Sequence, residues 1–85
     1  MKKVPVSKKH FAFVDDGDYD LVIQFKWHMV RRGRNNYAST SIGGKKVAMH
    51  RMIMKAPKGI MIDHADGNGL NNQRANLRPC SYAQN

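Results

Sequence analysis

A single cysteine, Cys80, limits the ways in which this chain of 85 residues can be held together. One thiol cannot form an intramolecular disulfide, and it cannot supply a four-cysteine or Cys/His zinc cage. We therefore expect no structural zinc and a fold that rests on one modest hydrophobic core, with a bound ligand adding to its stability. The absence of disulfides also favours a reducing, cytoplasmic setting.

The charge of the chain is concentrated in its later part. Residues 1–20 carry four lysines and four aspartates, which cancel, whereas residues 21–85 carry eleven Lys and Arg against Asp63 and Asp66 alone. The net charge is +9, and the chain contains no glutamate. A basic surface of this kind attracts polyanions, so nucleic-acid binding is favoured over the alternative of a merely solvated basic face.

The N-terminal region gives no sign of a membrane protein. No apolar run approaches the roughly 20 residues that a membrane-spanning helix needs. Residues 1–9 are basic and lack the apolar stretch of a signal peptide. We therefore expect no association with a membrane.

Residues 1–55 are predicted to form a β-rich segment. Residues 11–14, 26–30, 37–42 and 45–49 have the composition of short strands, and Gly43-Gly44 is a strong two-residue hairpin signal. Aspartates at 15–18 are expected to begin a helix over 19–25, and residues 50–55 to form a second helix that Pro57 ends. The pattern over 11–49 predicts one small antiparallel sheet with one short helix.

Residues 56–85 form the second part of the same single domain, and they concentrate polar chemistry. An apolar strand at 60–63 leads directly to His64, and a polar loop follows it. One helical turn is expected near 73–76, an extended segment at 77–80, and a helix from Tyr82 onward that Ser81 caps and the chain end cuts short. Asn76 lies twelve residues after His64, and Asn85 lies nine residues after Asn76.

This spacing resembles that of the HNH endonucleases, whose fold is the ββα-metal motif. The segments that carry the resemblance are residues 47–51, 56–59, 62–68, 70–72, 76–78 and 81–85. Residues 14–27 and 37–38 are similar to the segment that precedes the motif in phage and homing-type members. The fold class that follows is α+β, a small antiparallel β-sheet followed by a ββα-metal (HNH) motif.

The resemblance implies metal-dependent hydrolysis of DNA phosphodiester bonds that leaves a 5′-phosphate and a 3′-hydroxyl. In this reading His64 is the general base, since a histidine pKa lies near working pH. Asp63 and Asn85 hold one divalent ion, and their oxygen ligands favour Mg²⁺ or Mn²⁺. Asn76 hydrogen-bonds the His64 ring and fixes its orientation, a role for which Asn71 and Asn72 are competitors.

Adjacent residues of a regular strand point to opposite faces, so Asp63 and His64 share one site only if the strand ends or bulges there. His50 is expected to have a structural role, with contact to the substrate as the minority alternative. The cations expected to contact DNA phosphates are Arg51, Arg74, Arg78, Lys45 and Lys46.

A basic DNA-binding module without cleavage, or an inactive truncated HNH fragment, is the main alternative to a nuclease. The net charge supports both, but simple binding does not require the set formed by Asp63, His64, Asn76 and Asn85. An RNA-binding structural protein explains the charge and leaves that set unexplained. The expected partner is double-stranded DNA, with nicking or double-strand cutting, and a monomer or a homodimer, left open.

Overall fold

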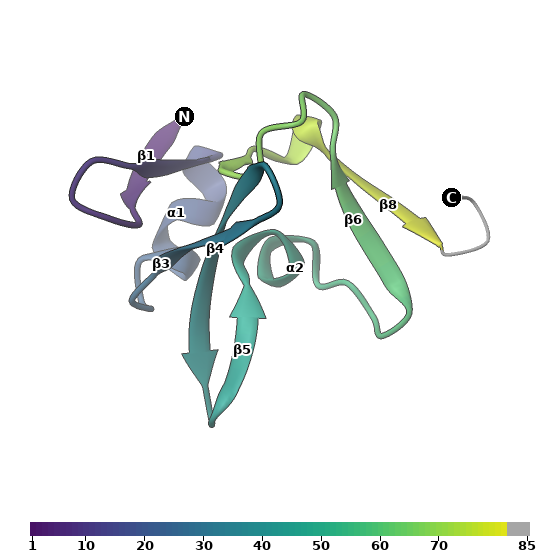
Figure 1. Ribbon diagram of the computed structural model, residues 1–85, viewed down its shortest axis with the longest axis horizontal. Helices are drawn as coiled ribbons and strands as arrows, with labels where there is room; N and C mark the ends of the chain where they lie inside the picture. The colour runs from purple at the N-terminus through teal and green to yellow at the C-terminus, as the bar shows by residue number, and fades with distance from the viewer. Residues whose placement is uncertain (82–85) are drawn as a thin grey trace.

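In the computed structural model, which describes residues 1–81, short strands and two short helices form an α+β arrangement with three small sheets (Figure 1). The first sheet has the order β1-β2-β7. Strand β1 (Lys2–Pro5) pairs antiparallel with β2 (Phe11–Val14), and β7 (Asn71–Asn72) lies parallel to β2 on its other side. A segment near the end of the chain is thereby fixed against the N-terminal strands.

The second sheet is the antiparallel series β3 (His28–Arg32), β4 (Asn35–Ile42) and β5 (Lys45–Ala48). Both of its turns have two residues. Gly43 and Gly44 have φ angles of 57° and 81°, which glycine adopts without steric cost, and the predicted Gly-Gly hairpin is confirmed. Gly33 occupies the β3–β4 turn with φ 60°.

The prediction of one antiparallel sheet over residues 11–49 is wrong. Strand β2 belongs to a different sheet from β3, β4 and β5. Strand β2 pairs instead with β1, a strand that was not predicted from the sequence because two lysines precede its buried valine. Lys2 and Lys3 are exposed while Val4 and Val6 are buried, so this basic segment packs against the core and takes the edge of β2.

Helix α1 (Asp16–Val22) begins and ends three residues earlier than predicted, and Asp15 makes no side-chain cap hydrogen bond. Helix α2 (Met49–Met54) ends at Lys55, whose φ of 50° is left-handed, two residues before Pro57. Met49 and Ile53 of α2 are fully buried. The remaining buried apolar side chains are Val4, Val6, Ala12, Val14, Val22, Trp27, Ala38, Leu70 and Leu77.

The third sheet is the antiparallel pair of β6 (Ile60–His64) and β8 (Leu77–Ser81). The connection between them contains β7 and the 3₁₀ turn η1 (Arg74–Asn76). The ββα-metal motif expected here stays a prediction, because the helix expected from Tyr82 lies outside the described residues. Within residues 1–81, no helix has the length and apolar character to cross a bilayer.

Candidate active site

The end of β6 positions the histidine that the sequence singled out. The strand alternates in exposure, so Asp63 is exposed and the ring of His64 is buried. Its pairing with β8 continues without interruption through Asp63↔Arg78 and His64↔Leu77. The strand therefore ends at His64 without a bulge, and the two side chains leave it on opposite faces.

Asp63 is held on the outer face of the hairpin by an arginine of β8. Its Oδ2 accepts a hydrogen bond of 2.7 Å from Nη2 of Arg78, and both side chains are more than half exposed. Asn85, the second predicted metal ligand, lies outside the described residues. Among residues 1–81, no three His, Cys, Asp or Glu side chains converge as a metal-binding group. The divalent ion stays a prediction.

The His64 ring is held by Asn72 of β7. Nε2 of His64 lies 2.8 Å from Oδ1 of Asn72, whose side chain is completely buried. With the amide oxygen facing the ring, Nε2 must carry the hydrogen, because this oxygen only accepts. The lone pair of the imidazole is then on Nδ1. This arrangement fixes the tautomer and makes Nδ1 the basic atom.

The predicted contact between Asn76 and the His64 ring is wrong. Asn76 lies at the end of η1, where both hydrogens of Nδ2 are used, one by Oδ1 of Asp66 and one by the carbonyl of Asn71. Its Oδ1 accepts from the backbone N–H of Asp66. Asn76 therefore fixes the loop after His64, and Asn72, one of its competitors in the sequence, contacts the ring.

Asp66 is the centre of that loop. Its carboxylate accepts from Asn71 Nδ2, from the backbone N–H of Asn68 and from Asn76 Nδ2. These hydrogen bonds, with that of Asn71 the largest influence, hold the pKa of Asp66 below its usual value. Gly67 N–H donates to the carbonyl of His64 at 2.9 Å. The loop is thus ordered by its own polar side chains.

Two further rings lie against His64. The ring of His50, from α2, is 4.9 Å from it between centroids, and that of Tyr37, from β4, is 5.7 Å away. Burial first, and then the charges of His64 and Arg51, lower the pKa of His50 to about 4, so His50 is neutral at pH 7. Its Nδ1 is buried without a hydrogen-bond partner among the described residues. The sequence predicts a structural role for His50, with contact to the substrate as the minority alternative, and leaves the role of Tyr37 undecided.

The three arginines predicted to contact phosphates all have intramolecular partners. Arg51 donates to the carbonyls of Ile60, Ala56 and Pro57, which fixes the segment between α2 and β6. Arg74 binds Asp18 of α1 through two hydrogen bonds of 2.9 Å, and Arg78 binds Asp63. Their role in DNA binding stays a prediction, and a phosphate would have to compete with these intramolecular partners for each guanidinium group.

Lys45 and Lys46 are exposed beside the β4–β5 turn. This turn lies at the opposite end of β4 from the loop that follows His64 (Figure 1). Strand β4 has eight residues, so the two ends are separated by roughly 20–25 Å at about 3.3 Å per residue. Their contact with DNA phosphates stays a prediction.

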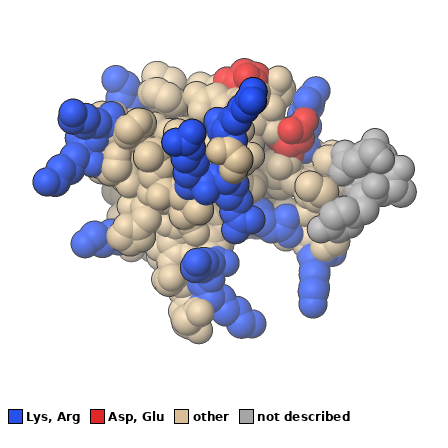
Figure 2. Space-filling model, in the orientation of Figure 1, with Lys and Arg blue, Asp and Glu red and all other residues tan. Residues whose placement is uncertain are grey.

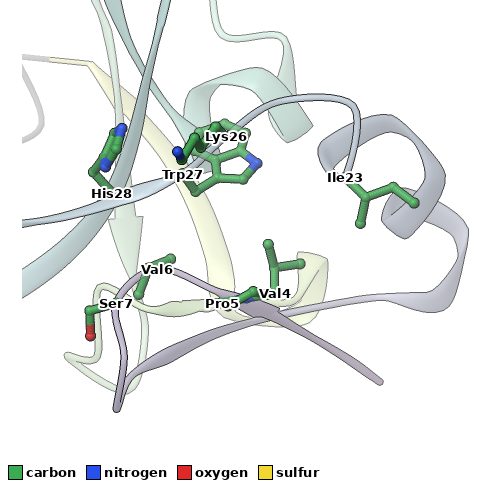
Figure 3. Close-up of a pocket in the computed structure, with 8 residues that line it drawn as sticks. All are labelled: Val4, Pro5, Val6, Ser7, Ile23, Lys26, Trp27 and His28. Carbon is green, nitrogen blue, oxygen red and sulfur yellow. The ribbon is translucent and has the colours of Figure 1, made fainter.

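A separate hollow of about 540 Å³ lies between β1 and the segment that joins α1 to β3 (Figure 3). Its lining includes the buried side chains of Val4, Val6 and Trp27 and the exposed Ile23. Trp27 is part of the core and donates through Nε1 to the carbonyl of Val22. The hollow shares no lining residue with the group around His64.

One comparison supports the resemblance found in the sequence. Over 86 aligned residues the chain is 36% identical to an uncharacterised HNH endonuclease of Acanthamoeba polyphaga mimivirus. The match covers 93% of this chain and 43% of the viral protein, so the chain spans less than half of that relative. No protein-family profile matches the chain, and no solved structure matches it. The chain is therefore similar to a protein named as a nuclease.

Proposed function

We propose that this chain is the nuclease part of an HNH-type endonuclease and that it hydrolyses phosphodiester bonds of double-stranded DNA. The observation that carries the proposal is the buried His64 ring, whose Nε2 is held by Asn72 so that Nδ1 is the basic atom. The net charge of +9 suits a polyanionic substrate, and the viral relative is named as an HNH endonuclease.

In the proposed reaction, Nδ1 of His64 takes a proton from a water molecule as the water oxygen attacks phosphorus. The bond from phosphorus to the 3′-oxygen breaks, which leaves a 5′-phosphate and, after protonation by solvent, a 3′-hydroxyl. The hydrogen bond from Nε2 to Asn72 keeps the ring oriented while its charge changes. His50, whose ring packs beside that of His64, is neutral at pH 7.

We further propose that Asp63 and Asn85 would hold one divalent ion, Mg²⁺ or Mn²⁺, which would supply positive charge at the leaving oxygen. Asp63 fits in part, because its carboxylate is an exposed oxygen donor next to His64 in sequence. It also leaves the strand on the opposite face and is shared with Arg78. Holding an ion beside the His64 ring would therefore require Asp63 to release Arg78 and its side chain to turn toward the face of His64.

Cleavage of supercoiled plasmid with Mg²⁺, Mn²⁺ or EDTA tests the proposal. Wild type should produce nicked or linear DNA only with metal, and His64→Ala should abolish it. His28→Ala is the matched control, because His28 is an exposed histidine on β3, and it should cut like wild type. Circular dichroism should show that all three proteins are folded.

A second candidate function is a basic DNA-binding module without cleavage, which the net charge favours equally. A gel shift at low salt from a folded protein that never cuts plasmid in either metal would support it and overturn the nuclease proposal.

A further inference from the structure

The β3–β4 turn carries a group of cations that the predicted DNA contacts did not include. Arg31, Arg32 and Arg34 are all exposed, and none of them forms an ion pair with a carboxylate in the described part of the chain. Figure 2 shows a group of Lys and Arg side chains over the upper middle of the molecule, where Figure 1 places this turn. Arg51, Arg74 and Arg78, by contrast, are occupied within the protein.

Asn35 fixes this turn to the loop that begins at His64. Its Nδ2 donates to the carbonyl of Gly67 at 2.8 Å, and its Oδ1 accepts from the N–H of Gly69 at 2.9 Å. Gly67 in turn donates to the carbonyl of His64. Three hydrogen bonds therefore connect the arginine-bearing turn to the backbone of the proposed general base.

The strand register decides which arginine faces the site. Opposite residues of an antiparallel pair share a face, and successive residues alternate. Arg32 is opposite Asn35, whose face it shares with Tyr37, and the ring of Tyr37 lies against that of His64. Arg31 is opposite Asn36, on the other face. Arg34 lies in the two-residue turn that connects Arg32 to Asn35.

We propose that the β3–β4 turn is a phosphate clamp in which Arg32 and Arg34 bind backbone phosphates of duplex DNA beside the bond presented to His64. A guanidinium group matches two phosphate oxygens at once, and an arginine without an internal partner gives up no hydrogen bond to bind them. The attachment through Asn35 makes the clamp position the scissile bond as well as attract the duplex. This position beside His64 rests on the proposed nuclease function.

Binding of a fluorescent duplex, measured in EDTA between about 50 and 200 mM salt, tests the clamp without cleavage. Each phosphate contact adds close to one unit to the slope of log affinity against log salt. Arg32→Gln/Arg34→Gln should lower the slope by about two and weaken binding at least tenfold near 100 mM salt. Lys8→Gln/Lys9→Gln removes the same charge from the exposed β1–β2 turn and should leave the slope nearly unchanged. Equal slopes for the two double variants would overturn the clamp.

Asn35→Ala tests the attachment, because it keeps every arginine but releases the turn from the loop. The salt slope should stay at the wild-type value, while kcat for plasmid cleavage should fall about tenfold with little change in KM. Wild-type kcat in a folded Asn35→Ala protein would overturn the positioning role. If wild type fails to cut plasmid while Arg32→Gln/Arg34→Gln still lowers the salt slope by about two, the nuclease proposal fails and the DNA contact stands.

Discussion

At the scale of single residues, the proposed chemistry depends on how one imidazole is surrounded. His64 is buried, Asn72 holds its Nε2, and the rings of His50 and Tyr37 pack beside it. Each neighbour comes from a different element, namely β7, α2 and β4. The orientation of the ring is thus set by the tertiary structure rather than by β6 alone.

Replacing Asn72 by leucine should separate positioning from folding. The change removes the acceptor for Nε2 of His64, so we expect kcat for plasmid cleavage to fall by about 10–100-fold. Two effects on stability oppose each other, because the change removes the buried Asn72 Nδ2, which has no partner among the described residues, but leaves the buried Nε2–H of His64 without its acceptor. We therefore expect a net loss of no more than about 2 kcal/mol. The duplex dissociation constant should not change. Wild-type kcat in the folded variant would contradict the role of Asn72.

His50 should make the stability of the protein depend on pH. Its pKa is lowered to about 4 from an ordinary 6.5, so below pH 6.5 the unfolded chain binds a proton that the folded chain does not. The free energy of unfolding therefore has its full value above pH 6.5 and decreases as the pH falls from 6.5 toward 4. Because solvent at the partly exposed ring reduces the effect, we expect the free energy of unfolding to fall by about 1 kcal/mol between pH 7 and pH 5.

Urea unfolding at pH 7 and pH 5 measures this loss. His50→Phe should reduce the difference between the two pH values, whereas His28→Phe, at an exposed position, should leave it as in wild type. Identical pH dependence in wild type and His50→Phe would show that His50 is not the titrating group.

At the scale of elements, the close approach of β4 to the loop after His64 holds the site together. Gly69 is the point of contact, because a Cβ built on it would lie 2.2 Å from the backbone carbonyl oxygen of Asn36 and 2.6 Å from the Tyr37 ring. Only a residue without a side chain allows the Asn35 hydrogen bonds to form at this separation.

Gly69→Ala should therefore destabilise the protein by about 2 kcal/mol or more, since the backbone it would meet cannot move aside cheaply. Gly17→Ala is the matched control. Gly17 lies in α1 with open space around it, and alanine there should be neutral or stabilise by up to about 1 kcal/mol. Chemical denaturation compares the two variants, and equal stabilities would contradict the close contact.

At the scale of the whole molecule, Arg74 connects the later part of the chain to helices α1 and α2. Its guanidinium binds the buried carboxylate of Asp18 in α1 and the carbonyl of Ile53 in α2, and its backbone N–H donates to Asp15. Together with the parallel pairing of β2 and β7, this contact attaches residues 71–76 to the N-terminal half. The segment that carries Asn72 is positioned by these long-range contacts.

Arg74→Met should lower the free energy of unfolding by about 1–3 kcal/mol, because Asp18 would stay buried without its cation. Arg78→Met should cost less than about 1 kcal/mol, since its ion pair with Asp63 is exposed. Thermal unfolding of the two variants at pH 7 tests the difference. Equal losses would mean that Arg74 is not the structural cation.

The sequence by itself determined the local features: most strands and both helices to within a few residues, the Gly-Gly turn, and the histidine at the end of an apolar strand. These follow from hydrophobic periodicity and turn chemistry, which act between near neighbours. The tertiary structure decided that Asn72 rather than Asn76 contacts His64 and that Arg74 is occupied by Asp18. It also placed Arg32 on the face that meets the site. The physical reason is that an amide or a guanidinium binds whichever group the packing of distant strands brings within hydrogen-bond reach, and spacing along the chain does not encode that distance.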